Sequence, residues 1–367
     1  MLRIVIKNIA RVLMMAVLFS NAAQAEEETI KLGGNVDEDG TVHVEEFDLP
    51  LSELISEDTR QVLNRSAQEL STFTCPGGRY PGRNKKEILA FRKCWDPLAL
   101  PVISKLRERH NVDIKPETIA GIYTEVITPM AGVSGKNQKR VLINLHGGAM
   151  QMGARVGGQV ESIAVAAMGN IKVISVDYRM YPEHIYPAAS EDVISVYKEL
   201  LKTYQAKNIG IYGCSAGAML AARAVARIRH EKLTQPGAVG MFCYGATRAE
   251  GDTYIAMGAV EGVNVKDRPQ NIGYLSKANL DDPLVYPGEH PEVLEKFPAS
   301  LLLSGIRDRA LSTVVYTHSQ LIKLGVEADL HVWEGLGHGG FYNPDLPEFV
   351  EAHNVIVRFF DKHLGWE

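Results

Sequence analysis

The chain has 367 residues, of which 46% are hydrophobic and 23% charged, and its formal net charge is −5. These proportions are those of an ordinary globular protein that is long enough to bury a large core. A net negative charge, with no basic run longer than residues 136–140, excludes a typical nucleic-acid-binding surface. We expect one main domain with a smaller accessory part.

The N-terminal segment has the pattern of a secretory signal. Three basic residues precede or border the apolar run 12–19, and residues 23–25 read Ala-Gln-Ala, a typical cleavage site. The apolar run is too short to cross a bilayer, and no cysteine follows the cleavage site to carry a lipid. The pattern predicts cleavage after Ala25 and a secreted or periplasmic protein without a stable membrane anchor.

All four cysteines follow Ala25. In an oxidising compartment Cys75 and Cys94 are expected to form a disulfide, and its loop of roughly 20 residues would contribute on the order of 3 kcal/mol. Two buried free thiols are the alternative. Cys214 and Cys243 lie in or next to predicted strands and are expected to pack as small side chains.

Ahead of the predicted sheet, the sequence indicates an acidic arm followed by helices. Residues 26–58 carry many acidic and few large apolar side chains, as extended segments do. Helical patterns follow over 51–70 and 85–109, and the second is expected to break near Pro97 and Pro101.

From residue 119 onward, short apolar strands alternate with helices. This alternation predicts an α/β fold with a mostly parallel central sheet that is covered by helices on both faces. The expected strands are 119–128, 140–145, 171–176, 209–212, 238–244, 299–304 and 328–333, and the expected helices are 160–168, 188–204, 216–230, 313–324 and 347–363.

Residues 247–296 interrupt the alternation and are rich in Gly, Asn, Asp and Pro. They predict an inserted piece that forms a cap over the site together with the helices of 51–109. The expected organisation is a signal peptide (1–25), an acidic arm and helical cap (26–117), a core in two parts (118–246 and 297–367) and the cap insertion (247–296).

Residues 213–217 read Gly-Cys-Ser-Ala-Gly between an expected strand and an expected helix. A G-x-S-x-G sequence in this setting is the nucleophile elbow of serine hydrolases, because its glycines permit a sharp turn that exposes the serine at a helix N-terminus. The pattern alone is weak evidence in a chain with 33 glycines, so its context has to support it. Ser215 is the candidate nucleophile.

A serine nucleophile needs a base, and the base needs an acid that orients it. Asp308 follows the strand 299–304, and His338 follows the strand 328–333. Both lie just after strand ends, where open parallel sheets form their sites, and in the order Ser, Asp, His. Taken singly, the alternative for Asp308 is a helix cap, and the alternative for His338 is an ordinary loop residue. Taken together, the order and the positions of the two residues favour a catalytic triad.

Acyl transfer also needs N–H donors for the oxyanion. Residues 146–149 read His-Gly-Gly-Ala after a strand and match a loop type that supplies such donors together with the residue after the nucleophile. The expected oxyanion-hole residues are Gly147, Gly148, Ala149 and Ala216. A plain glycine turn is the alternative, and we expect His146 to stabilise the loop rather than act as a second base.

These motifs, together with residues 177–192, resemble the hormone-sensitive-lipase family of α/β-hydrolases over roughly residues 119–363. The segment reads Asp-Tyr-Arg-Met-Tyr-Pro-Glu-His and then Tyr-Pro-Ala-Ala-Ser-Glu-Asp, and we interpret it as structural support for the oxyanion loop. Residues 305–312 are similar to a subgroup of carboxylesterases and monoterpene lactone hydrolases. Two departures stand out, because Ala149 replaces the last glycine of the family's loop and Cys214 replaces an acidic residue often found before the serine.

The resemblance implies a serine carboxylesterase for small or medium esters that needs no cofactor. A lactone hydrolase with the same triad is the first alternative, and a non-catalytic small-ligand receptor on the same fold is the second. Metal-dependent hydrolysis lacks a ligand motif. The expected partner is a small-molecule ester or lactone, and self-association is left open. The candidates for an apolar substrate pocket are Phe91, Trp95, Met150 and Met152.

Overall fold

The computed structural model describes residues 35–44, 48–72, 75, 84–261 and 273–365. The predicted signal sequence lies outside them. The chain divides at Pro50 into two units. In the first, β1 (Asn35–Val36) and β2 (Val42–His43) form a short antiparallel hairpin. The second unit begins at Leu51 and contains the central sheet.

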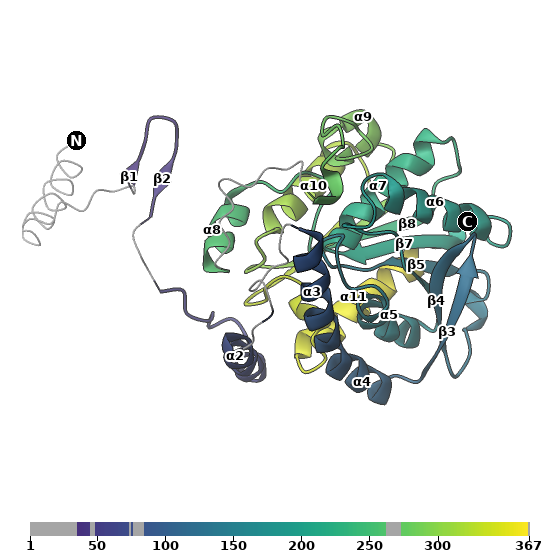
Figure 1. Cartoon of the computed structure of the whole chain (residues 1–367), viewed down its shortest axis with the longest axis horizontal. Coiled ribbons are helices and arrows are strands. Elements are labelled where there is room, and N and C mark those ends of the chain that lie inside the picture. Colours follow the sequence, from purple (N-terminus) through teal and green to yellow (C-terminus); the bar gives the residue numbers. More distant parts are fainter. Residues whose placement is uncertain (1–34, 45–47, 73–74, 76–83, 262–272, 366–367) are drawn as a thin grey trace, which may run out of the picture. The chain divides into compact units, whose positions relative to one another are not determined.

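A sheet of eight strands forms the centre of this unit in the described part of the chain, in the order β10-β9-β8-β7-β5-β6-β4-β3 (Figure 1). The strands from β10 to β6 are parallel, and β4 and β3 are antiparallel to their neighbours. Their bounds are β3 Val112–Ile119, β4 Ile122–Pro129, β5 Val141–Leu145, β6 Lys172–Val176, β7 Ile209–Cys214, β8 Ala238–Phe242, β9 Ala299–Gly305 and β10 Ala328–Trp333.

Helices cover both faces of this sheet. On one face, α5 (Val156–Gly169) and α11 (Pro347–His363) pack against residues such as Leu142 and Phe242. On the other face, a second apolar cluster joins α6 (Ala188–Leu200), α7 (Ala216–His230) and α10 (Leu311–Lys323) to the strands. The predicted α/β fold, with a mostly parallel sheet between two helical layers, is confirmed.

Helices lie in the described parts of the segment before the sheet and of the insertion. Here α2 covers Glu57–Thr72, α3 Lys85–Trp95 and α4 Ala99–Arg109, while α8 (Asp252–Val260) and α9 (Pro291–Leu294) lie in the insertion. The predicted break near Pro101 is wrong, since α4 runs through it. Proline is tolerated there because it stands in the first turn, where its missing N–H would have no partner within the helix.

The strand β3 is absent from the sequence-based expectation. It lies at the sheet edge, and its residues are half-buried or exposed, so it has no apolar run to reveal it. It pairs along its whole length with β4 through a tight turn at Ala120 and Gly121, both with positive φ, as a two-residue hairpin requires.

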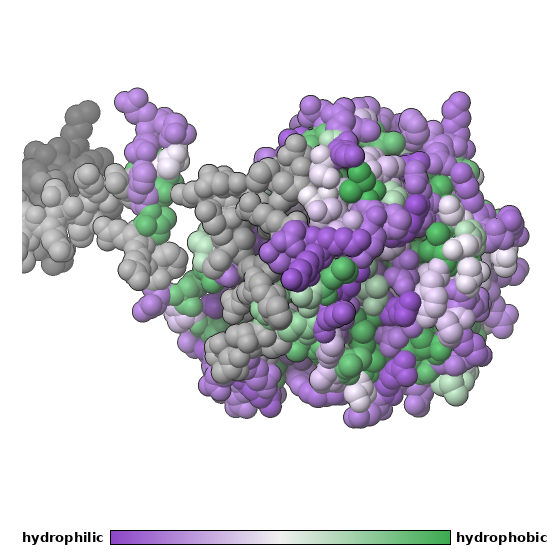
Figure 2. All heavy atoms as spheres, in the orientation of Figure 1, coloured by the Kyte–Doolittle hydropathy of each residue, from purple (hydrophilic) through white to green (hydrophobic). Residues whose placement is uncertain are grey.

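Hydrophilic side chains cover much of the face in Figure 2, with hydrophobic side chains in small groups among them. Such mixing is usual for a protein surface in water. Among the described residues, no helix combines the length and the apolar character that crossing a membrane would require.

Candidate active site

The structure brings three of the predicted residues together at the carboxyl ends of three strands. Ser215 directly follows β7, Asp308 follows β9 and His338 follows β10. The Ser215 hydroxyl lies 2.8 Å from His338 Nε2, and His338 Nδ1 lies 2.8 Å from Asp308 Oδ1. The arrangement has the hydroxyl donating to Nε2 and the Nδ1–H donating to the carboxylate, which is the order a serine nucleophile needs.

The turn at Ser215 is strained, as expected for a nucleophile elbow. Its φ and ψ are 58° and −116°, and its N–H donates to Phe242 O at 2.7 Å. A Cβ at Gly213 or Gly217 would lie 2.1 or 1.7 Å from the carbonyl oxygen of Leu145. Both glycines are therefore required by the close approach of β5, and the strain stored at Ser215 is held in place by this packing.

Asp308 is fully buried. Burial alone would raise its pKa, but the charge and hydrogen bond of His338 lower the pKa below the ordinary value, with further help from Ala310 N–H and the Ser304 hydroxyl. The carboxylate is therefore ionised at neutral pH. It can hold the imidazole in one tautomer and stabilise a positive charge on it.

The loop after β5 offers two unused amide groups beside Ser215. In the described part of the chain, the N–H groups of Gly148 and Ala149 donate to no acceptor. Both residues have positive φ, 117° and 54°, and a Cβ at Gly148 would collide with Met152 O. The alanine at position 149 thus adopts the left-handed backbone that a glycine would take more easily, at a cost of about 1–2 kcal/mol.

Gly147 does not fit its predicted place in the oxyanion hole. Its N–H donates to Glu161 Oε1 at 2.7 Å and so is not available to a substrate. Its contacts still place the loop against the nucleophile, because a Cβ there would lie 3.6 Å from Ser215 Cβ. The donors compatible with this structure are Gly148, Ala149 and Ala216, the first residue of α7.

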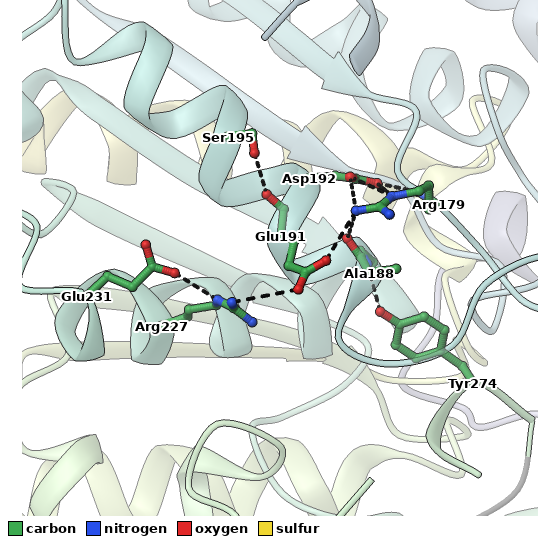
Figure 3. A network of polar contacts seen from close by, with 9 residues as sticks. Arg179, Ala188, Glu191, Asp192, Ser195, Arg227, Glu231 and Tyr274 are labelled. Atoms are coloured by element: carbon green, nitrogen blue, oxygen red, sulfur yellow. Dashed lines mark hydrogen bonds and ion pairs between the residues drawn. The ribbon is translucent and has the colours of Figure 1, made fainter. Parts of the chain in front are cut away.

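The segment after β6 supports this loop. Tyr178 donates its hydroxyl to His146 O at 2.6 Å, and its ring stacks on the buried His146 imidazole, which bonds Gly147 O through Nδ1. Figure 3 shows the adjoining network, in which the buried Asp192 accepts from both the backbone N–H and the guanidinium of Arg179. These contacts hold the segment in place, as the sequence interpretation had it.

The four pocket candidates differ in exposure. Phe91 and Met150 are only 1% and 5% exposed, and Met150 packs into the apolar cluster that contains α6 and α7. Trp95 and Met152 are half-buried, and Trp95 stacks on Phe91. The two buried side chains offer almost no surface to a ligand in this structure, so Trp95 and Met152 remain the better candidates.

Sequence reasoning missed Arg92, which ties α3 to the loop. Its Nε donates to Gln151 O at 2.7 Å and one terminal nitrogen to Tyr181 O at 3.1 Å, and the guanidinium pairs with Glu183. No motif marks such a residue. Its role follows from contacts between segments far apart in the chain.

Cys75 and Cys94 form a disulfide, with Cα atoms 5.9 Å apart, that anchors α3. Cys214 and Cys243 are free, buried and in contact through their sulfur atoms. Burial raises the pKa of both thiols, which makes them unreactive packing residues. Among the described residues, no group of three or more His, Cys, Asp or Glu side chains is placed to hold a metal ion.

Similarity to known proteins agrees with this geometry. Residues 142–342 match a family described as having the alpha/beta hydrolase fold. An esterase of Acinetobacter venetianus is 30% identical over 141 residues, which cover 37% of this chain and 45% of the relative. An acetyl-hydrolase of Streptomyces hygroscopicus is 28% identical over 62% of this chain and 77% of its own length.

Solved structures share the fold over most of the chain. The crystal structure of an esterase named E25 is 28% identical, with a TM-score of 0.78, and the match covers 88% of this chain and 99% of E25. An esterase of the bacterial hormone-sensitive-lipase family, 22% identical with a TM-score of 0.70, has the same fold over 85% of this chain and 99% of its own. The family match over residues 142–342 spans more than half of the chain, so the chain belongs to the family with the alpha/beta hydrolase fold, the fold that the resemblance drawn from its sequence implied.

Proposed function

We propose that the protein is a serine carboxylesterase that hydrolyses small to medium acyl esters with Ser215, His338 and Asp308 as its catalytic triad. One observation carries the proposal, the continuous hydrogen-bonded chain from the Ser215 hydroxyl through His338 to the buried Asp308 carboxylate. The names of the relatives support it, since they are called esterase and acetyl-hydrolase.

In the proposed reaction, His338 Nε2 takes the hydroxyl proton as Ser215 Oγ attacks the ester carbonyl carbon. The carbonyl oxygen becomes an oxyanion that accepts hydrogen bonds from the N–H groups of Gly148, Ala149 and Ala216. Each such donor is worth roughly 3 kcal/mol in the transition state. His338 then gives its proton to the leaving alcohol, and a water molecule, activated by the same imidazole, releases the acid and frees Ser215.

A panel of p-nitrophenyl esters of increasing acyl length tests the proposal, with simple lactones run beside it. We expect hydrolysis of the short to medium esters by the wild-type protein and none above background by Ser215→Ala. A folded wild-type protein that hydrolyses no ester would refute the esterase proposal. Hydrolysis of lactones but of no ester would favour the lactone-hydrolase alternative. Binding of a small ester or lactone without turnover would favour the receptor alternative.

We also propose that the protein is exported and loses residues 1–25. The support is the basic, apolar and Ala-Gln-Ala pattern of the N-terminus. N-terminal sequencing of the protein from the periplasm or the medium should begin at Glu26. A full-length protein retained in the cytoplasm would contradict the proposal.

A further inference from the structure

A buried carboxyl group from α5 reaches between the two segments that form the candidate site. Glu161 is 4% exposed and is the one charged side chain of α5 (Val156–Gly169). Its Oε1 accepts the Gly147 N–H at 2.7 Å. Its Oε2 accepts the Asn144 side-chain amide at 2.9 Å and the Cys214 N–H at 3.3 Å.

Two of these three donors are backbone groups next to reacting groups. Gly147 immediately precedes the amides of Gly148 and Ala149, and Cys214 immediately precedes Ser215. One side chain therefore bridges the oxyanion loop and the nucleophile strand. A buried amide left without a hydrogen-bond partner is costly, so the acceptor that Glu161 supplies to each of these two amides stabilises the arrangement.

The packing leaves little freedom around this bridge. A Cβ at Gly147 would lie 3.1 Å from Cys214 O and 3.4 Å from Glu161 Oε1, so the loop, the strand and the carboxyl group are in close contact. Cys214 itself brings no charge or acceptor of comparable strength to this point. In the described part of the chain, the carboxyl group at this point therefore comes from Glu161 on α5, because Cys214 at the end of β7 does not supply one.

Glu161 is itself held from several sides. Tyr212, on β7, donates its hydroxyl to the Glu161 carbonyl at 3.2 Å. Asn144, on β5, is oriented by Ser175, whose hydroxyl donates to its Oδ1 at 3.0 Å. The carboxyl group is consequently fixed relative to β5, β6 and β7. A group that sets the distance between the oxyanion loop and the nucleophile strand must be held rigidly in this way.

We propose that Glu161 is a positioning residue, whose carboxyl group sets the spacing between the oxyanion-loop amides and Ser215 and thereby stabilises the transition state. The inference rests on the proposed esterase function. It goes beyond the triad because Glu161 touches neither the substrate nor the reacting atoms. Displacement of catalytic groups by about 1 Å can lower a rate about 100-fold, so a loss of this spacing should be measurable.

Two variants test the role. Glu161→Gln has nearly the same shape and can still accept the Gly147 N–H, but its amide nitrogen then faces the Cys214 N–H. Glu161→Ala removes every acceptor. For a p-nitrophenyl ester we expect kcat to fall about 10-fold in Glu161→Gln and about 100-fold in Glu161→Ala, while KM changes less than about threefold.

Ser162→Ala is the matched control. Ser162 is the next residue of the same helix and fully buried, and in the described part of the chain its hydroxyl accepts a long hydrogen bond from Tyr212, at 3.5 Å. This variant should keep kcat within about twofold of wild type, since it perturbs the helix without touching the oxyanion loop. Equal losses of kcat in Ser162→Ala and Glu161→Gln would overturn the proposal in favour of a general effect of α5.

A trifluoromethyl ketone supplies the second measurement. It forms a tetrahedral oxyanion on Ser215, so its inhibition constant should rise in each Glu161 variant by the same factor as kcat/KM falls. Folding is checked by thermal unfolding, and if Glu161→Ala does not fold, the isosteric Glu161→Gln decides. If folded Glu161→Gln has the same kcat and the same inhibition constant as the wild-type protein, the positioning role is refuted. If the wild-type protein itself hydrolyses no ester, the esterase function is refuted instead.

Discussion

Asp308 is a buried residue with the properties that the proposed catalysis requires. Its pKa is held down by His338 and by two further donors, so it stays ionised although no water reaches it. In Asp308→Asn, the amide can direct an N–H donor at Nδ1 in place of an acceptor oxygen. The imidazole then carries its proton on Nε2, which can no longer accept the proton of Ser215. We expect kcat to fall about 10⁴-fold with little change in KM.

Asp329→Asn provides the comparison, because Asp329 lies within β10 and not at its end. It should retain wild-type kinetics on the same p-nitrophenyl ester. Substantial activity in Asp308→Asn would mean that another acid orients His338.

Gly217 shows how narrowly the elbow is constrained. A Cβ there would lie 1.7 Å from Leu145 O, and the other two nearest atoms, Leu145 C and His146 O, are also backbone, so no flexible side chain can move away. Gly217→Ala should therefore lower the free energy of unfolding by about 3 kcal/mol or more, or prevent folding. Urea unfolding of this variant is compared with Gly135→Ala, whose added Cβ meets nothing within 4 Å. Equal stability of the two variants would contradict the packing described for the elbow.

At the residue scale, the sequence identifies the candidate catalytic side chains but not the residues that support them. Ser215, Asp308 and His338 each stand at a strand end, which the local pattern reveals. Glu161 and Arg92 contact partners 14 to 91 positions away, and no local pattern records such contacts. A lone carboxyl group in the apolar stretch 160–168 was the available signal for Glu161, since burying it requires hydrogen-bond partners.

The helix α11 contains a histidine that should make stability depend on pH. His353 is fully buried, donates its Nδ1–H to Phe349 O and packs on the Phe349 ring. Burial lowers its pKa to about 4, against 6.5 for an exposed histidine. The folded protein therefore keeps the imidazole neutral while the unfolded chain takes up a proton below about pH 6.5.

The sign follows from this difference. The unfolded state binds the extra proton, so stability should fall as the pH drops from about 6.5 to about 4, by roughly 3 kcal/mol from this group. Urea unfolding at several pH values should show this loss in wild type and a smaller one in His353→Phe. His331→Gln, at an exposed position, should behave as wild type. An unchanged pH dependence in His353→Phe would show that the imidazole is charged in the folded protein.

At the scale of elements, the predicted alternation held because most strands are buried on both faces and read as apolar runs. The expected bounds of α7 and α11 coincide with those observed. The edge strand β3 was missed for the opposite reason. Its exposed side chains include Lys115 and Glu117, and its strand conformation depends on pairing with β4.

For the second unit as a whole, the Cys75–Cys94 disulfide is the covalent link within the described residues. It joins the chain beyond α2 to α3. Arg92 of α3 and Asp96, which directly follows the helix, bond the loop at Gln151 and Gly153. Cys75→Ser combined with Cys94→Ser should cost about 3 kcal/mol of stability, chiefly because the unfolded chain gains freedom.

Thermal unfolding with and without dithiothreitol measures this effect. Wild type should lose several degrees of Tm in the reductant, while the double variant should start lower and not respond, since Cys214 and Cys243 are already thiols. An equal response of both proteins would show that the reductant acts elsewhere.

The sequence by itself determined the fold class and the three residues of the candidate triad. Strands, helices and the turns between them are encoded by neighbours a few positions apart, and parallel strands bring their carboxyl ends to one edge. Only the tertiary structure decided how the Gly147 N–H is used. That choice depends on a carboxyl group from α5 that meets β5 and β7 in the packed core, where every buried amide must find an acceptor.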